Sequence, residues 1–325
     1  MTGSVIIGTG SCLPKRILTN HELEKMVDTS DEWITTRTGI RERRIAVRGE
    51  ETSKLAAVAA NNALAMAGVA PEEIGLIILA TISPDMVMPS CACLVQKEIG
   101  ATNAFAFDLN AACSGFVYAL EVADRYIMKD PDMKALVIGA ETLSARTNWQ
   151  DRNTCVLFGD GAGACVVAGG DDGQGVLASQ MYSDGKFWHL LSLAGAPSLN
   201  TDLAKAETSG AGIQMAGPDV FKLAVRSLED AVTSLLKREG RSIEEIDLVI
   251  PHQANIRILK SMGERLRVPF EKIYTTIHKY GNTSAASVPV ALDEANREGR
   301  LNRGDLLLLC VFGGGFTWGS ALVRW

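Results

Sequence analysis

The chain has 325 residues, of which 47% are hydrophobic and 22% are charged, and its formal net charge is −6. This composition is typical of a soluble globular protein with room for two packed units, and the mild acidity argues against nucleic acid as the main partner. No apolar run reaches the roughly 18 residues that span a bilayer, and the N-terminal sequence lacks the basic start and long apolar stretch of a signal peptide. We therefore expect a cytoplasmic protein that binds no nucleic acid and no membrane.

Seven cysteines are spread along the chain without a CxxC pair. This spacing predicts neither a zinc site nor a redox dithiol, and reduced thiols in the cytoplasm are the simplest account. Most of the seven should be small core residues, and at most one needs a special role. We expect no metal site.

Two glycine-rich stretches invite comparison with nucleotide-binding loops. The first, "VIIGTGSCLP", begins like a dinucleotide-binding loop, but its third glycine is absent and Pro14 interrupts the expected helix. We therefore reject a Rossmann site. The second, "FGDGAGACVV" (158–167), lacks the lysine of a phosphate loop and is predicted to form a turn between strands.

Residues 31–40, "DEWITTRTGI", place Trp33 and Arg37 one helical turn apart. The two side chains could hold a flat base by stacking and cation–π contact. An exposed aromatic residue with an ordinary helix neighbour is the alternative.

The segment around Cys113 combines a strand with a following helix. Residues 103–109, "NAFAFDL", are predicted to form the strand, and apolar residues after Cys113 recur near helical spacing. A thiol at a helix N-terminus gains thiolate character from the helix dipole and a nearby imidazole, and a thiolate can form an acyl-enzyme from a thioester. A buried core thiol is the alternative.

An internal repeat indicates two related halves. Residues 244–250, "EEIDLVI", resemble residues 72–78, "EEIGLII", and each copy follows an amphipathic helical pattern. The helix before the first copy should end at Gly68, and the helix before the second should begin near Pro218 and end at Gly240.

Each half closes with a strongly apolar strand, at residues 134–140 and 305–315. Such strands, separated by helices, indicate sheets that are covered on both faces. We predict an α/β fold of two duplicated halves, residues 1–172 and 173–325, with the boundary in "AGGDDGQG" (168–175). Coincidence between generic strand–helix units is the alternative.

Two polar residues of the second half lie at ends of predicted elements. His252 ends an apolar strand in "PHQAN", where ligands gather in α/β sheets, although a structural histidine is an equally good interpretation. Asn282 precedes a run of small residues, and in isolation it is more typical of a helix cap. By the repeat, Asn282 takes the place of Cys113, so a pseudo-twofold packing of the halves would bring all three residues together.

This trio suits one kind of chemistry. A neutral imidazole and a carboxamide can both donate hydrogen bonds to the oxyanion of an enolate, which forms when a β-carboxyl group leaves as CO₂. The glycines of "FGGGFTWGS" (312–320) could bring a further amide close to the substrate and complete an oxyanion hole with the Cys113 N–H. A tight turn without such a role is the alternative.

Six ordered segments of the chain carry a family resemblance: "DEWITTRTGIRERR", "AACSGFVYAL", "FGDGAGA", "HQANIRI", "GNTSAASVP" and "GGGFTWGSALVRW". They resemble the β-ketoacyl-acyl-carrier-protein synthase III enzymes of the thiolase superfamily, over nearly the whole chain. The resemblance implies a thiolase-like five-layered αβαβα fold and a homodimer. It also implies a decarboxylating Claisen condensation of an acyl-CoA primer, with acetyl-CoA as first candidate, and malonyl-acyl-carrier protein, which initiates fatty acid synthesis.

The resemblance also assigns roles to residues. Cys113 would be the acylated nucleophile, His252 and Asn282 would assist decarboxylation, and Gly314 would be the second oxyanion donor beside the Cys113 amide. The remaining matches are Trp33, Arg37 and Arg152 for the adenine end of coenzyme A, Asn255 for the pantetheine channel, Arg257 for carrier-protein docking and Met88 for the partner's acyl pocket. By their charge, Lys260, Arg265 and Arg267 could extend the docking surface.

Acyl-CoA is a substrate in this scheme, and no metal, nicotinamide or flavin cofactor is needed. Two other hypotheses stay open. The acyl-cysteine could pass to another acceptor, as in secondary metabolism, or the chain could be a catalytically silent subunit that binds acyl-carrier proteins. Retention of Cys113, His252 and Asn282 argues against the silent subunit.

Overall fold

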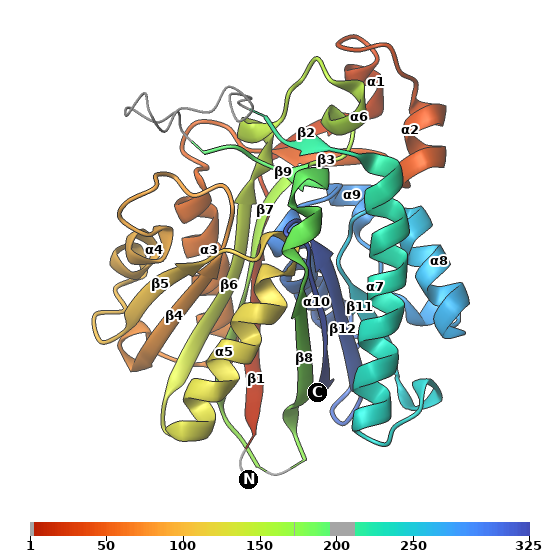
Figure 1. Ribbon diagram of the computed structural model, residues 1–325. Helices are drawn as coiled ribbons and strands as arrows, with labels where there is room; N and C mark the ends of the chain where they lie inside the picture. Colours follow the sequence, from red (N-terminus) through yellow and green to blue (C-terminus); the bar gives the residue numbers. More distant parts are fainter. Residues whose placement is uncertain (1–2, 172, 196–211) are drawn as a thin grey trace.

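Two mixed β-sheets face each other across a layer of two helices in the computed structural model of the chain, which describes residues 3–171, 173–195 and 212–325 (Figure 1). Further helices cover the outer face of each sheet, so the layers follow in the order α, β, α, β, α. The predicted five-layered fold is confirmed. Residue 172, where the predicted boundary between the halves falls, lies outside the described residues.

The first sheet comes from the first half of the chain and has the strand order β1–β7–β6–β4–β5. Its strands are β1 (Ser4–Cys12), β4 (Ile74–Ala80), β5 (Phe105–Leu109), β6 (Lys134–Thr142) and β7 (Asp160–Gly169). Strands β6, β4 and β5 run parallel, while β7 is antiparallel to both β1 and β6. Because helices cover both faces, β4 is buried at every position but one.

The second sheet repeats this arrangement with the order β8–β13–β12–β11. Its strands are β8 (Gly175–Ser183), β11 (Leu248–Pro251), β12 (Leu306–Gly313) and β13 (Thr317–Arg324). Strands β11 and β12 are parallel, and β13 is antiparallel to β12 and β8. An isolated parallel bridge from Val249 to Ile273 occupies the place that β5 has beside β4.

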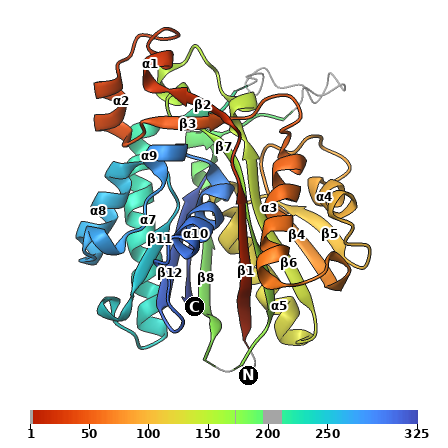
Figure 2. The same ribbon diagram turned by 180° about the vertical axis from the view of Figure 1, so that it is seen from behind.

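Six helices form the three helical layers. They are α3 (Thr52–Ala67) and α4 (Cys91–Ile99) outside the first sheet, α5 (Gly115–Lys129) and α10 (Ser287–Arg297) between the sheets, and α7 (Gly217–Arg238) and α8 (Ile256–Leu266) outside the second sheet. Figure 2 shows the two outer layers on opposite flanks of the molecule. Helix α3 ends before Gly68, which has a φ of 65°, and α7 has Pro218 in its first turn, so both predicted helices are confirmed.

In the segment 158–167 the structure differs from the sequence interpretation. Residues 160–167 belong to strand β7 and do not form a turn. The glycines there serve close packing, because a Cβ on Gly163 would lie 2.6 Å from the backbone nitrogen of Val290 in helix α10. Glycine-rich sequence therefore marks a helix–sheet contact at this position.

Smaller elements gather at one end of the sheets, at the top of Figure 1. They are β2 (Arg16–Thr19), α1 (Asn20–Leu23), α2 (Asp31–Thr38), β3 (Glu42–Ile45), α6 (Arg152–Cys155), β9 (Leu191–Ser192), β10 (Gln214–Met215) and α9 (Ile277–Tyr280). Their apolar side chains form a separate core cluster. No helix in the described ranges is both long and apolar enough to cross a membrane.

The two strand-to-helix junctions have the same backbone. Ala112 starts the turn before α5 with a φ of 46°, and Ser284 starts the turn before α10 with a φ of 49°. The Ala112 amide donates to Oδ1 of Asn110 at 3.3 Å, and the Ser284 amide donates to Oδ1 of Asn282 at 2.8 Å. Asn282 therefore corresponds to Asn110, and the prediction that it takes the place of Cys113 was wrong by three residues.

Candidate active site

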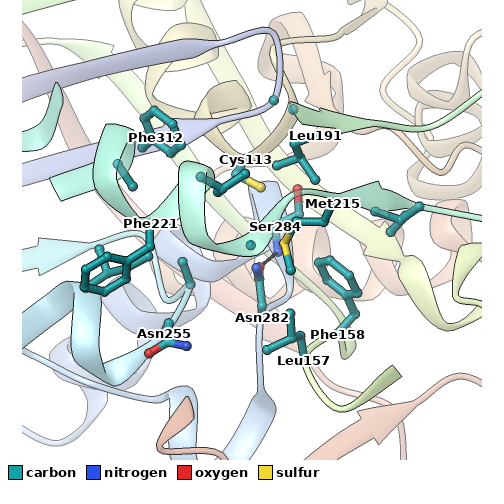
Figure 3. Close-up of a pocket in the computed structure, with 18 of the residues that line it drawn as sticks. Cys113, Leu157, Phe158, Leu191, Met215, Phe221, Asn255, Asn282, Ser284 and Phe312 are labelled. Carbon is teal, nitrogen blue, oxygen red and sulfur yellow. Dashed lines mark hydrogen bonds between the residues drawn. The ribbon is translucent and has the colours of Figure 1, made fainter. Parts of the chain in front are cut away.

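A cavity of about 1120 Å³ opens between the two halves, where both junctions meet. It is lined by Cys113 from the first half and by Asn282 from the second (Figure 3). His252 and Gly314 of the second half also line it. Trp33, Arg37, Asn255 and Arg257 also line it, whereas Arg152, Lys260 and Met88 do not. The structure thus brings together the residues predicted for the chemical step.

Cys113 lies in the turn Ala112–Ser114 that leads into helix α5, and its exposed fraction is 7%. Thr317 braces this turn, because its Oγ1 donates to the Ala111 carbonyl at 2.9 Å and its own carbonyl accepts from Ser114 Oγ at 3.0 Å. Burial raises the pKa of the Cys113 thiol to about 12, with a further contribution from the charge of Glu141. The expectation of thiolate character in the resting site was therefore wrong, since burial without a nearby cation favours the neutral thiol.

His252 follows strand β11, and its backbone amide donates to the Cys310 carbonyl at 2.9 Å. Nδ1 lies 2.7 Å from Ser287 Oγ, which also accepts the Gln253 amide at 3.3 Å. We assign the single hydrogen of the Ser287 hydroxyl to the bond with Nδ1 of His252, which places the ring hydrogen of the neutral imidazole on Nε2. Burial lowers the His252 pKa to about 3, so the imidazole is neutral and donates from Nε2.

Asn282 is held by its main chain and oriented by its side chain. Its N–H donates to the Leu157 carbonyl at 2.9 Å, and its carbonyl accepts from the Gly159 amide at 3.0 Å. The segment that holds Asn282 is itself anchored, because the fully buried Arg43 donates to the carbonyl of Val156, the residue before Leu157. Because Asn282 Oδ1 accepts a hydrogen bond from the Ser284 amide, the NH₂ group of Asn282 is left to donate into the cavity.

The glycine turn after β12 lies against the cysteine. A Cβ on Gly313 would lie 2.7 Å from the Cys113 backbone nitrogen, so only glycine permits this approach. Gly314 follows in the cavity wall. The position is compatible with an amide beside the reacting carbonyl, while the oxyanion role of Gly314 stays a prediction.

Three of the predicted coenzyme A residues meet at the mouth of the cavity. The guanidinium carbon of Arg152 lies 4.1 Å from the centre of the Trp33 ring, and that of Arg37 lies 5.8 Å from it. Arg152 also pairs with Asp28 at 3.8 Å. Trp33 is thus in cation–π contact with Arg152.

Asn255 joins the two sides of the mouth. Its Oδ1 accepts the Arg257 amide at the start of helix α8, and its Nδ2 donates to the Arg37 carbonyl at 3.1 Å. Both polar atoms have partners within the chain, so the contribution of Asn255 is to hold α2 against α8 beside the channel.

Of the predicted docking residues, Arg257, Lys260 and Arg265 lie exposed on helix α8, and Arg267 lies exposed directly after it. Arg257 lies over the Phe221 ring at 5.3 Å, and Lys260 lies over the Phe270 ring at 6.0 Å. Arg265 differs, because it makes a 2.6 Å ion pair with Glu229 and its charge is already matched. Met88 lies in the loop before α4, with an exposed fraction of 84%, outside the cavity of its own chain.

Three site residues were not singled out from the sequence: Glu141, Ser284 and Ser287. Glu141 is fully buried at the end of β6, where it accepts hydrogen bonds from Ser83 Oγ, Thr81 Oγ1 and the Ile82 amide. A charged residue directly after the apolar run 135–140 was the available signal. The two serines lie among other small residues, and no local pattern distinguishes them.

No cluster of three metal-binding side chains occurs in the parts of the chain that the structure describes. All seven cysteines are free. The cavity combines a thiol, an imidazole, carboxamides and hydroxyls, and its wall also includes the cations of Arg37, Lys222 and Arg257. A thiol beside neutral hydrogen-bond donors is a set for acyl chemistry.

Comparison with known families and proteins agrees with this chemistry. A family described as 3-oxoacyl-[acyl-carrier-protein (ACP)] synthase III matches residues 107–185, and the C-terminal part of that synthase matches residues 236–325. The beta-ketoacyl-[acyl-carrier-protein] synthase III of Desulfotalea psychrophila is 59% identical over 321 residues, which are 99% of each chain.

Two solved structures have the same fold throughout. The 3-oxoacyl-[acyl-carrier-protein] synthase III of Aquifex aeolicus matches with a TM-score of 0.92 and 51% identity, over 99% of this chain and 100% of that one. The synthase III of Thermus thermophilus matches with a TM-score of 0.93 and 41% identity, over 99% of each chain.

Proposed function

The chain belongs to the 3-oxoacyl-[acyl-carrier-protein] synthase III family of thiolase-fold condensing enzymes, and we propose that Cys113, His252 and Asn282 carry out its reaction. The enzyme is an acyltransferase that catalyses the initiating condensation of fatty acid synthesis. The observation that carries the residue assignment is the meeting of one thiol with two neutral hydrogen-bond donors in a single cavity.

In the first half-reaction, the Cys113 sulfur attacks the thioester carbonyl of the acyl-CoA primer. The carbonyl oxygen becomes an oxyanion, which the backbone amides of Cys113 and Gly314 stabilise. Collapse of the tetrahedral intermediate expels coenzyme A and leaves the acyl group on Cys113. Acetyl-CoA is the primer that we expect first.

In the second half-reaction, malonyl-acyl-carrier protein enters the cavity and loses CO₂. The electron pair of the broken bond forms an enolate, whose oxygen accepts hydrogen bonds from Nε2 of His252 and Nδ2 of Asn282. The enolate carbon attacks the acyl-Cys113 carbonyl, and departure of the cysteine sulfur gives 3-oxoacyl-acyl-carrier protein. Both donors are neutral, which suits an oxygen that gains negative charge only during the reaction.

Further residues are expected to contact coenzyme A and the acyl-carrier protein. Trp33, Arg37 and Arg152 would hold the adenine end of coenzyme A at the mouth, and Asn255 would line the pantetheine channel. Arg257 and Lys260 would dock the acidic carrier protein through their exposed charges on α8. The remaining assignments concern the assembly and its setting: a homodimer in the cytoplasm, Met88 reaching the partner's acyl pocket, and no cofactor beyond the acyl-CoA substrate.

The acylation step can be tested by mass spectrometry of the protein after incubation with acetyl-CoA. We expect one acetyl group on the peptide that contains Cys113 and none in Cys113→Ala. The alanine variant should retain some decarboxylation of malonyl-acyl-carrier protein, since His252 and Asn282 remain. An unmodified Cys113 after incubation with acetyl-, branched- and longer acyl-CoA would overturn the assignment.

A further inference from the structure

Glu141 and Ser284 form a buried polar pair beside the nucleophile that the two half-reactions above leave unused. Glu141 is fully buried, and Ser284 is 1% exposed in the cavity wall. Ser284 begins a turn that packs against both strand β6, which carries Glu141, and the turn that carries Cys113. Its hydroxyl lowers the pKa of Glu141 and of Cys113, yet it completes a hydrogen bond to neither. A buried hydroxyl without a partner is costly, so its retention calls for a physical reason.

The backbone of Ser284 does not supply that reason. Its left-handed φ of 49° is matched by Ala112, which has a φ of 46° at the corresponding position of the other half. The junction therefore accepts alanine, and what Ser284 adds is the hydroxyl alone. Figure 3 shows the Ser284 and Cys113 side chains at the same cavity.

The resting site also lacks an acceptor for the thiol proton at His252. With the Ser287 hydrogen assigned to Nδ1 of the imidazole, Nε2 already carries a hydrogen. Burial further opposes the imidazolium, because it lowers the His252 pKa to about 3. His252 is arranged to donate, and another group must hold the proton that Cys113 loses when it attacks the thioester.

We propose that Glu141 takes the Cys113 proton through the Ser284 hydroxyl during acylation and returns it to the departing coenzyme A sulfur. As the thiol proton passes to Ser284 Oγ, the hydroxyl proton passes to the Glu141 carboxylate, and the Cys113 electron pair forms the carbon–sulfur bond. When the bond to coenzyme A breaks, its electron pair stays on that sulfur, which receives the proton by the reverse path. After this transfer Glu141 is again a carboxylate. In the second half-reaction it first binds a proton from solvent, the one proton that the overall condensation consumes, and passes it through Ser284 to the Cys113 thiolate that leaves the product.

Charge balance favours this route in a buried site. Transfer to Glu141 moves one negative charge from the carboxylate to the thiolate, so the site never holds a new ion pair. It also removes the charge that otherwise raises the Cys113 pKa. The two groups share one proton and titrate as a coupled pair.

The surroundings of Glu141 suit a group that both accepts and releases a proton. Burial raises its pKa to about 7, while the donors Ser83, Ile82 and Thr81 oppose that rise. In the described part of the chain no salt bridge reaches Glu141, and the charge of Glu141 raises the pKa of Cys113. A carboxyl that titrates near neutrality can serve in both directions.

The test measures the rate of Cys113 acetylation by acetyl-CoA in single-turnover experiments at pH values on both sides of 7. Because Glu141 must be unprotonated to accept, the wild-type rate should rise with pH and level off above its pKa of about 7. Glu141→Gln should acetylate about 10²–10⁴-fold more slowly and without that inflection. Exposed Glu98→Gln is the matched control, since Glu98 pairs with Lys54 at the surface and should leave the rate unchanged.

Ser284→Ala provides the second variant, and Ala112 shows that its backbone tolerates alanine. It should lose acetylation rate to a similar extent while the Glu141 carboxyl stays in place. Decarboxylation of malonyl-acyl-carrier protein needs no thiol proton, so in both variants it should fall far less than acetylation. A wild-type rate and pH profile in either variant, or an equal loss of both partial reactions, would overturn the relay.

The relay rests on the proposed function, and the two can fail separately. If the wild-type enzyme does not acetylate at Cys113, the proposed function is wrong. If the wild type acetylates and Ser284→Ala does so equally fast, only the relay is wrong.

Discussion

Cys113 illustrates how burial and the helix dipole compete at a single side chain. The rise of its pKa from 9.0 to about 12 corresponds to roughly 4 kcal/mol against the thiolate, at about 1.36 kcal/mol per unit. A helix N-terminus favours an anion by about 0.3–2 kcal/mol. Burial therefore dominates, and the thiol must be deprotonated as it reacts.

Asn282 permits a prediction that separates the two half-reactions. Asn282→Ala removes one of the two donors to the enolate oxygen, while Cys113 and its amide remain. Decarboxylation of malonyl-acyl-carrier protein should fall by about 10²–10³, and acetylation of Cys113 should be retained. The measurements are CO₂ release and the mass of the Cys113 peptide. An equal loss of acetylation would contradict the division of roles.

At this scale the sequence indicated which residues carry the chemistry but not their protonation or orientation. Cys113, His252 and Asn282 stood out because they end apolar strands or begin helices. Their protonation depends on burial and on second partners such as Ser287, which come from distant segments. Neither spacing nor composition contains that information.

The glycine turn after β12 sets the distance between two elements, the last strand pair and the turn that carries Cys113. A Cβ on Gly313 would meet backbone atoms, the nitrogens of Cys113 at 2.7 Å and Ser114 at 3.0 Å, which cannot rotate away. Gly313→Ala should therefore shift the nucleophile and lower acetylation on the order of 10²-fold. Gly185→Ala is the control, because nothing lies within 4 Å of the Cβ there. Equal rates in the two variants would show that the close approach is unimportant.

Element prediction worked where periodicity and end signals agreed, as in α3 with Gly68 and α7 with Pro218. It failed in 158–167, because glycine marks both turns and close packing. The register of the repeat was wrong by three residues because Cys113 and Asn282 were matched by their chemistry. The backbone aligns Asn110 with Asn282 instead.

For the whole molecule, strand β5 ends the first sheet, and one of its edges is unpaired among the described residues. Phe105 on that strand is 45% exposed, and the nearby loop exposes Met86, Val87 and Met88. Exposed apolar groups at a sheet edge favour pairing with another copy. We predict a dimer of twice the 34.8 kDa chain mass by light scattering, and a shift toward monomer in Phe105→Lys. A wild-type mass of one chain would contradict the homodimer.

We propose that residues 1–172 and 173–325 form the two halves. The halves share a backbone plan but differ in the chemical groups that they bring to the site. After a duplication, both copies of the junction would have begun with the same side chains. Today one holds the thiol of Cys113 and the other holds the amide of Asn282 and the hydroxyl of Ser284, on equal left-handed turns. Each copy supplies only part of the site, so a defect in one half cannot be rescued by the other. Selection therefore acts on the two halves together.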